Sequence, residues 1–198
     1  MCSRFELTAT PDEIARRFGL PVAGNLPNSP ELRPTDLALV ITATGPHLMN
    51  WGLAVDWDTK PLINARAETL DQKKTFRSLL ANRCLVPATA YFEWRKDGAA
   101  KHKNRIAPAD GQPMEPLFAF AGLYEGERFT IITCPPTPSI AHIHNRMPVI
   151  VDGKAEAQWI NSDMSFEAVS GTLIPYKADT LIAKEETPPP GPQPDLFD

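Results

Sequence analysis

Several features are scarce in this chain of 198 residues, and each scarcity excludes a class of protein. Three cysteines, an odd number, argue against a disulfide framework and for a reducing compartment. The longest apolar runs fall short of a bilayer-spanning helix, and the first residues lack the apolar stretch of a signal peptide. Neither a glycine-rich phosphate loop nor a serine nucleophile elbow occurs. We therefore expect a cytoplasmic protein.

The composition that remains is that of a globular domain. Hydrophobic residues make up 42% of the chain and charged residues 22%, and the length suits one domain. The net charge of −4 is unevenly spread, because the segment from Lys73 to Arg105 holds nine basic and only two acidic residues. Charge alone favours a solvated surface for this segment, and it does not exclude a polyanionic partner.

Alternating strand and turn signals predict the fold class. The run Thr10-Pro11-Asp12-Glu13 has the cap, the proline and the glutamate that begin a helix. Further elements are expected as strands over 37–43, 48–55, 84–94 and 173–176, a hairpin over 117–134, helices over 69–80 and 154–160, and loops over 21–36 and 97–116. This order indicates an α+β fold, a single compact domain around a largely antiparallel sheet. The domain is expected over residues 1–178, followed by an acidic, proline-rich disordered tail over 179–198.

Cys2 is a candidate nucleophile because of its position. The residue after Met1 is small, so removal of Met1 would leave a cysteine with a free α-amine. Amine and thiol titrate near 8 and about 8.5, so each is partly deprotonated near neutral pH. The amine can form an imine with an aldehyde, and the sulfur can close it to a thiazolidine. The alternative is an ordinary residue in a frayed terminus.

Three polar segments supply further candidates. Asn64 could orient a reacting group, and Arg66 nearby could hold a phosphate, or both could simply begin a helix. Glu93 lies between aromatic residues, which can raise a carboxyl pKa for acid–base work, although an outward-facing strand glutamate is the commoner reading. His144 could carry protons and Arg146 could contact phosphate.

A metal site is not expected. His142 and His144 lie two apart, but Cys84 and Cys134 lack metal-ligand spacing and are expected in the core. No cofactor is expected either.

Five stretches occur in a characteristic order: Met1 to Phe5, Trp51-Gly52-Leu53, Asn64 to Thr69, Arg83 to Trp94, and His144 to Pro148. Together they resemble the SRAP family, the SOS response-associated peptidase domain that processes abasic sites in DNA. The resemblance covers roughly residues 2–176 and implies a mostly β, barrel-like domain with flanking helices. It also implies that the protein senses abasic sites in single-stranded DNA and forms a covalent thiazolidine DNA–protein crosslink that shields the lesion.

The resemblance assigns roles to individual positions. It implies a catalytic group of Cys2, Asn64, Glu93 and His144, with Cys2 as the nucleophile after Met1 is lost. It implies DNA contacts by Arg4, Pro34, Trp51, Arg66, Arg146 and Met147. Autopeptidase activity at the bond before Cys2 and DNA lyase activity through the imine are further implications. Association with the nucleoid when DNA is bound, and a monomer, are expected.

The sequence departs from the family pattern at three positions. Ser3 and Ala90 stand where glycine is usual, and Phe92 stands where tyrosine is usual. These changes concern the geometry of DNA contact more than the chemistry. Two other functions stay open at this point: a thiol peptidase that uses Cys2 and His144 on peptide bonds, and a non-enzymatic module that binds single-stranded DNA and a clamp.

The chain ends in a short peptide that suggests a partner. Gln193, Asp195, Leu196 and Phe197 resemble the peptide by which bacterial proteins dock on the sliding clamp, and they follow a proline-rich tether. Leu196 and Phe197 would fill an apolar groove. The alternative is a disordered tail with a chance match.

Overall fold

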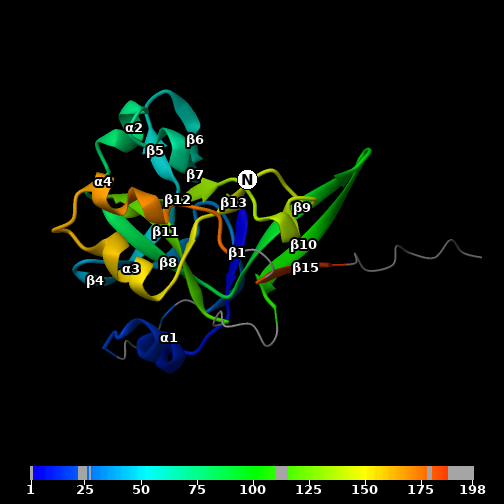
Figure 1. Ribbon diagram of the computed structural model, residues 1–198, viewed down its shortest axis with the longest axis horizontal. Coiled ribbons are helices and arrows are strands. Elements are labelled where there is room, and N and C mark those ends of the chain that lie inside the picture. Colours follow the sequence, from blue (N-terminus) through cyan, green and yellow to red (C-terminus); the bar gives the residue numbers. More distant parts are fainter. Residues whose placement is uncertain (1, 22–25, 27, 110–115, 178–179, 187–198) are drawn as a thin grey trace, which may run out of the picture.

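Two large β-sheets, a two-stranded sheet of β5 and β6, and a few short helices form the described part of the protein, as the computed structural model shows (Figure 1). The structure describes residues 2–21, 26, 28–109, 116–177 and 180–186. The strands are β1 (Arg4–Leu7), β2 (Ser29–Leu32), β3 (Leu37–Thr42), β4 (Gly45–Trp51), β5 (Leu53–Val55), β6 (Asp58–Leu62), β7 (Asn64–Arg66), β8 (Arg83–Ala88), β9 (Ala90–Asp97), β10 (Ala100–Pro108), β11 (Phe118–Glu125), β12 (Arg128–Cys134), β13 (Met147–Pro148), β14 (Ile150–Val151) and β15 (Leu181–Glu185). The helices are α1 (Pro11–Phe18), α2 (Lys74–Arg77), α3 (Gly153–Ile160) and α4 (Phe166–Val169), with short 3₁₀ turns η1 (Ala67–Thr69), η2 (Pro138–Ile140) and η3 (Ser170–Thr172).

The first sheet closes on itself. Strand β12 pairs antiparallel with β11 and, at Arg128 and Phe129, parallel with β4, which closes the ring β12-β4-β3-β8-β11. Farther along, β12 leaves β4 and pairs parallel with β7. Closure removes exposed strand edges from this part of the sheet. The expected α+β class with a barrel-like sheet is confirmed.

Aromatic side chains fill the core. Phe5 meets Trp51 edge to face with ring centres 5.1 Å apart, and Phe120 at 5.9 Å. Trp51 stacks on Phe129, and its indole N–H donates to the Ile63 carbonyl at 2.8 Å. Burial of such large apolar surfaces provides most of the free energy of folding, and the indole is stable here because its N–H is hydrogen-bonded.

The second sheet has the order β15-β10-β9-β1-β2, so β1 lies in its interior. The β9–β10 ribbon extends away from the barrel (Figure 1). Two expectations are corrected by this sheet. Residues 97–116 were expected as loop but contain β10, and the domain does not end at 178, because β15 pairs with β10 over Leu181–Glu185. Both strands carry polar residues on both faces, which hides the period of two.

Other expectations meet mixed outcomes. Helix α1 begins and ends as predicted, with a capping box between Thr10 and Glu13 and Gly19 in the left-handed conformation. The expected strand over 84–94 is instead two strands in different sheets, separated at Thr89, whose N–H donates to the Glu6 carbonyl. The expected helix over 69–80 shortens to the single turn of α2, a strand β2 lies within the expected loop 21–36, and 173–176 forms no strand.

No helix in the described ranges is long and apolar enough to cross a membrane.

Candidate active site at Cys2

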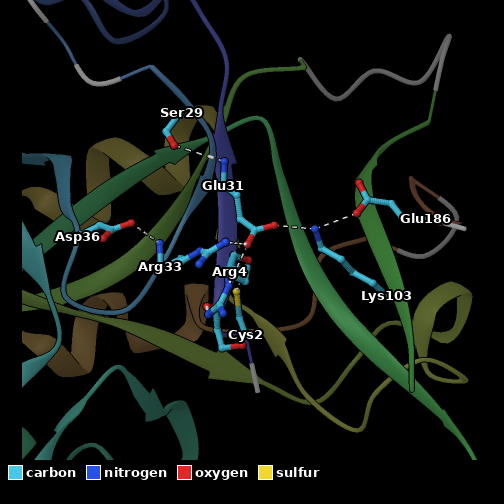
Figure 2. Close-up of polar contacts among 9 residues, drawn as sticks. Cys2, Arg4, Ser29, Glu31, Arg33, Asp36, Lys103 and Glu186 are labelled. Carbon is cyan, nitrogen blue, oxygen red and sulfur yellow. Dashed lines mark hydrogen bonds and ion pairs between the residues drawn. The ribbon is translucent and has the colours of Figure 1, made fainter. Parts of the chain in front are cut away.

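Cys2 is held in place by the two sheets rather than frayed. Its side chain is fully buried, and it immediately precedes Ser3 and the interior strand β1. Its carbonyl accepts a hydrogen bond from Asn64 Nδ2 at 2.7 Å, and its thiol donates to the Arg4 carbonyl at 3.3 Å (Figure 2 shows Cys2 beside Arg4). Burial raises the pKa of the thiol well above its usual range, and the nearby charge of Glu93 adds to this shift.

Asn64 reaches Cys2 because of the barrel topology. Strand β7 runs parallel to β12, with Asn64 opposite Ile131, after β12 has left β4. The Asn64 amide donates to Cys2 through Nδ2, whereas its buried Oδ1 has no hydrogen-bond partner among the described residues. Buried amide oxygens normally accept a hydrogen bond. This oxygen is therefore available to accept a hydrogen bond from a donor group that binds next to Cys2.

Glu93 places a carboxyl group next to the thiol. It lies on β9 and only 3% of it is exposed to solvent. Burial raises the pKa of its carboxyl to about 7. A carboxyl with such a pKa exists in both protonation states near neutral pH, which is the condition for efficient proton transfer in either direction. The notion of an outward-facing, solvated glutamate is wrong at this position.

His144 forms another part of the site. It is half-buried, and its Nδ1 lies 3.1 Å from the Arg146 backbone nitrogen. The Arg146 N–H donates into Nδ1, which assigns the proton of the neutral ring to Nε2. Burial lowers the pKa of the imidazole. The ring is thus neutral near pH 7 and suited to accept or relay a proton.

A hollow of about 340 Å³ opens beside these groups. It is lined by Ser3, Arg4, Glu93, Trp94, Lys96, Lys101 and His144. Glu93 and His144 thus face one space, and Ser3 and Arg4, the residues after Cys2, form part of its wall. The three basic side chains in the lining make the hollow favourable to a polyanion.

The predicted DNA-contact residues differ in their location and exposure to solvent. Arg4 lines the hollow, Arg66 is exposed and Pro34 is half-buried in a turn. Trp51 and Met147 are fully buried, so the expectation that they touch DNA is corrected: both pack inside the protein. The Met147 sulfur accepts a hydrogen bond from the Thr137 N–H at 3.3 Å.

Arg146 is already paired. Its guanidinium binds both oxygens of the Glu68 carboxylate at 2.6 and 2.9 Å and donates to the Thr133 carbonyl at 2.6 Å. Its side chain is only 12% exposed. A bidentate pair of this kind fixes the loop that carries His144. The clamp-docking residues 193–197 lie outside the described residues.

Sequence reasoning missed Tyr91, Trp94 and the two lysines of the hollow. Tyr91 is fully buried, two residues before Glu93 on the same face of β9, and its hydroxyl has no hydrogen-bond partner in the described part of the chain. The charges of Cys2 and Glu93 act with burial to raise the pKa of Tyr91. Lys96 and Lys101 face each other across the ribbon, a pairing that becomes visible only once β10 is recognised.

The described residues contain no group of three or more His, Cys, Asp or Glu side chains that could hold a metal ion.

Comparisons with known proteins identify the family to which this chain belongs. A protein from Bacteroides thetaiotaomicron has a crystal structure that matches with a TM-score of 0.80, at 27% identity over 93% of this chain and 91% of that one. Abasic site processing protein YoqW of Bacillus subtilis is 35% identical over 92% of this chain and 91% of its own length. Abasic site processing protein YedK of Escherichia coli is 30% identical over 86% and 84%, respectively. The family model of the SOS response associated peptidase (SRAP) matches residues 1–185, and the chain belongs to this family.

Proposed function

We propose that this protein captures abasic sites in single-stranded DNA by forming a thiazolidine through the amine and thiol of Cys2. The observation that carries the proposal is the hydrogen bond of 2.7 Å from Asn64 to the Cys2 carbonyl, which fixes the chain start beside the buried carboxyl of Glu93. The relatives named abasic site processing proteins support the choice of substrate.

The chemistry begins with an exposed amine. Hydrolysis of the peptide bond before Cys2 releases Met1 and leaves the α-amine. The closed abasic sugar opens to its aldehyde, the amine adds to the aldehyde carbon, and loss of water gives an imine. The sulfur then adds to the imine carbon, and the thiol proton ends on nitrogen. One amine, one thiol and one aldehyde thus become one thiazolidine and one water.

The residues of the site can carry out the proton transfers that these reaction steps require. Because burial keeps the Cys2 thiol protonated, ring closure requires a base close to sulfur. Glu93 has a carboxyl pKa of about 7, so it can accept that proton and, when protonated, assist departure of water. Neutral His144 faces the same hollow and can assist opening of the sugar. The imine is also the species from which β-elimination cuts DNA, so the same site has an intrinsic lyase route.

DNA would approach through the basic hollow. Arg4, Lys96 and Lys101 line it, and Arg66 is exposed on β7, two residues after Asn64. These cations can contact phosphates on either side of the lesion. Arg146 supports the His144 loop through Glu68 and is proposed as a phosphate contact only secondarily, since its guanidinium is already paired.

Intact mass spectrometry tests the proposal. The protein is measured alone and after incubation with a single-stranded oligonucleotide that carries one abasic site. We expect loss of Met1 and an adduct whose mass equals protein plus DNA minus one water, stable to denaturation. An undamaged oligonucleotide of the same sequence is the control. A chain that keeps Met1, or that loses Met1 and forms no adduct, contradicts the proposal.

The tail provides a second proposed partner, the replication sliding clamp. Deletion of residues 192–198 is expected to abolish retention on an immobilised bacterial sliding clamp while the yield of the abasic-site adduct stays unchanged. The double substitution of Leu196 and Phe197 by alanine should have the same effect, because these apolar side chains would fill the groove. Equal retention of full-length and shortened chains would remove the clamp from the list of partners.

A further inference from the structure

Glu31 lies at the centre of a cluster of basic residues on the open face of the second sheet. Its carboxylate contacts Arg4 at 3.1 Å, Lys103 at 2.6 Å and Arg33 at 3.2 Å (Figure 2). These three bases come from β1, β10 and the segment after β2. One carboxylate therefore gathers cations from three separate parts of the chain.

The cluster is continuous with the hollow at the site. Antiparallel pairing places Arg4 opposite Phe92, and Lys103 opposite Trp94, so these side chains share one face of the sheet. Lys103 covers the Phe92 ring, with its ammonium 4.1 Å from the ring centre. Arg4 also lines the hollow with Glu93 and His144. A DNA strand seated in the hollow would lie against this face.

Carboxylates of the protein itself partly neutralise the basic side chains on this face. Glu31 neutralises part of the charge of three bases, and Glu186 also contacts Lys103 at 2.8 Å. The pKa of Glu31 is lowered, chiefly by its hydrogen bond with Lys103, so the carboxylate stays ionised at neutral pH. All of these side chains are partly exposed, between 24% and 62%, so an incoming phosphate can reach them.

We propose that Glu31 occupies the position of a DNA phosphate and competes with the DNA backbone for Arg4, Arg33 and Lys103. The inference rests on the proposed function for its ligand, single-stranded DNA. Because Glu31 competes with DNA phosphates for these bases, undamaged strands bind weakly and dissociate. A strand with an abasic site is retained because it reacts covalently with Cys2. Glu31 is thus a specificity-determining residue: it lowers affinity without touching the reacting atoms.

The test is the affinity of Glu31→Gln for an undamaged, fluorescein-labelled oligothymidylate, measured by anisotropy over a series of salt concentrations. Glutamine keeps one acceptor oxygen for Arg4 but removes the charge. One more phosphate contact makes the slope of log K against log salt more negative by about 0.7, which corresponds to about fivefold tighter binding at 0.1 M salt. We expect that change for Glu31→Gln.

Glu127→Gln is the matched control. It changes the net charge equally, but Glu127 is exposed in the turn between β11 and β12, away from the second sheet. Equal affinities and slopes for the two variants, or weaker binding by Glu31→Gln than by the wild type, would overturn the inference. Adduct formation by the wild type is measured separately. Failure there contradicts the proposed function, whereas unchanged undamaged-strand binding contradicts only the role of Glu31.

Discussion

A Cys2→Ala variant loses the adduct that survives denaturation, yet still forms an imine with abasic DNA that borohydride traps. Alanine keeps the α-amine and removes only the sulfur that closes the ring. Without ring closure the imine persists, and strand cleavage by elimination is expected to increase. The measurements are adduct mass with and without borohydride, and the length of the DNA product on a denaturing gel. A removable N-terminal fusion exposes residue 2, so that release of Met1 is not a variable.

Cys84→Ala is the control for this experiment. Cys84 is also fully buried, but it lies on β8 and its thiol pKa is raised by burial alone. It is expected to keep the full yield of stable adduct. Blocking the α-amine of the wild type by acetylation should stop both adduct and imine while the thiol remains. A stable adduct from Cys2→Ala, or from the acetylated protein, would mean that another nucleophile captures the lesion.

A Glu93→Gln variant slows adduct formation by about 10² to 10⁴-fold, the contribution typical of a positioned acid or base. Glutamine has nearly the same shape but neither accepts nor delivers a proton on the reaction path. Single-turnover rates on abasic single-stranded DNA provide the measurement. The matched control is Glu127→Gln. A rate within a few-fold of the wild type would exclude Glu93 from the proton transfers.

The same variant has a pH signature in stability. The pKa of Glu93 is about 7 in the folded protein and near 4.5 in an unfolded chain, because burial disfavours the ionised form. The folded state therefore binds this proton more tightly than the unfolded chain does. As a result, the free energy of unfolding falls as pH rises from about 5 to about 8, by at most about 3 kcal/mol. Urea unfolding should show this loss in the wild type and its absence in Glu93→Gln. Parallel curves would indicate that the carboxyl is solvated.

The proposed catalytic group could be predicted from the sequence because its members lie in short, dissimilar motifs. Cys2 follows Met1, Glu93 lies among aromatics, and Asn64 and His144 lie in polar segments between apolar runs. Strand β12 brings Asn64 and the His144 segment together by pairing with β7 and β13, the β1–β9 pairing brings the Cys2 end to Glu93, and the Asn64–Cys2 hydrogen bond joins the two groups. Such pairings join residues far apart in the chain and leave no local signal.

The wrong expectations have physical causes that single-sequence patterns cannot reveal. Trp51 belongs to a motif that suggested DNA contact, but its indole fills the barrel core. An aromatic residue in a sequence motif is compatible with either place, so the motif alone does not distinguish them. Residues 100–105 are polar on both faces, and the strand forms because β9 and β15 supply backbone partners on both sides. Glu31 lay in a segment expected as loop, and its three basic partners converge only in the folded chain.

The interior position of β1 has a mechanical consequence. In the proposed adduct, DNA joined to Cys2 would pull on the end of a strand that is flanked by β9 and β2. Interstrand hydrogen bonds lie perpendicular to the strands, so a load along β1 shears two ladders together instead of opening bonds one after another. A motor that travels along the attached DNA would meet high resistance to unfolding from this end. The opposite terminus follows β15, which is an edge strand and can peel, so a machine that unfolds proteins from that end would extract the captured protein with less force.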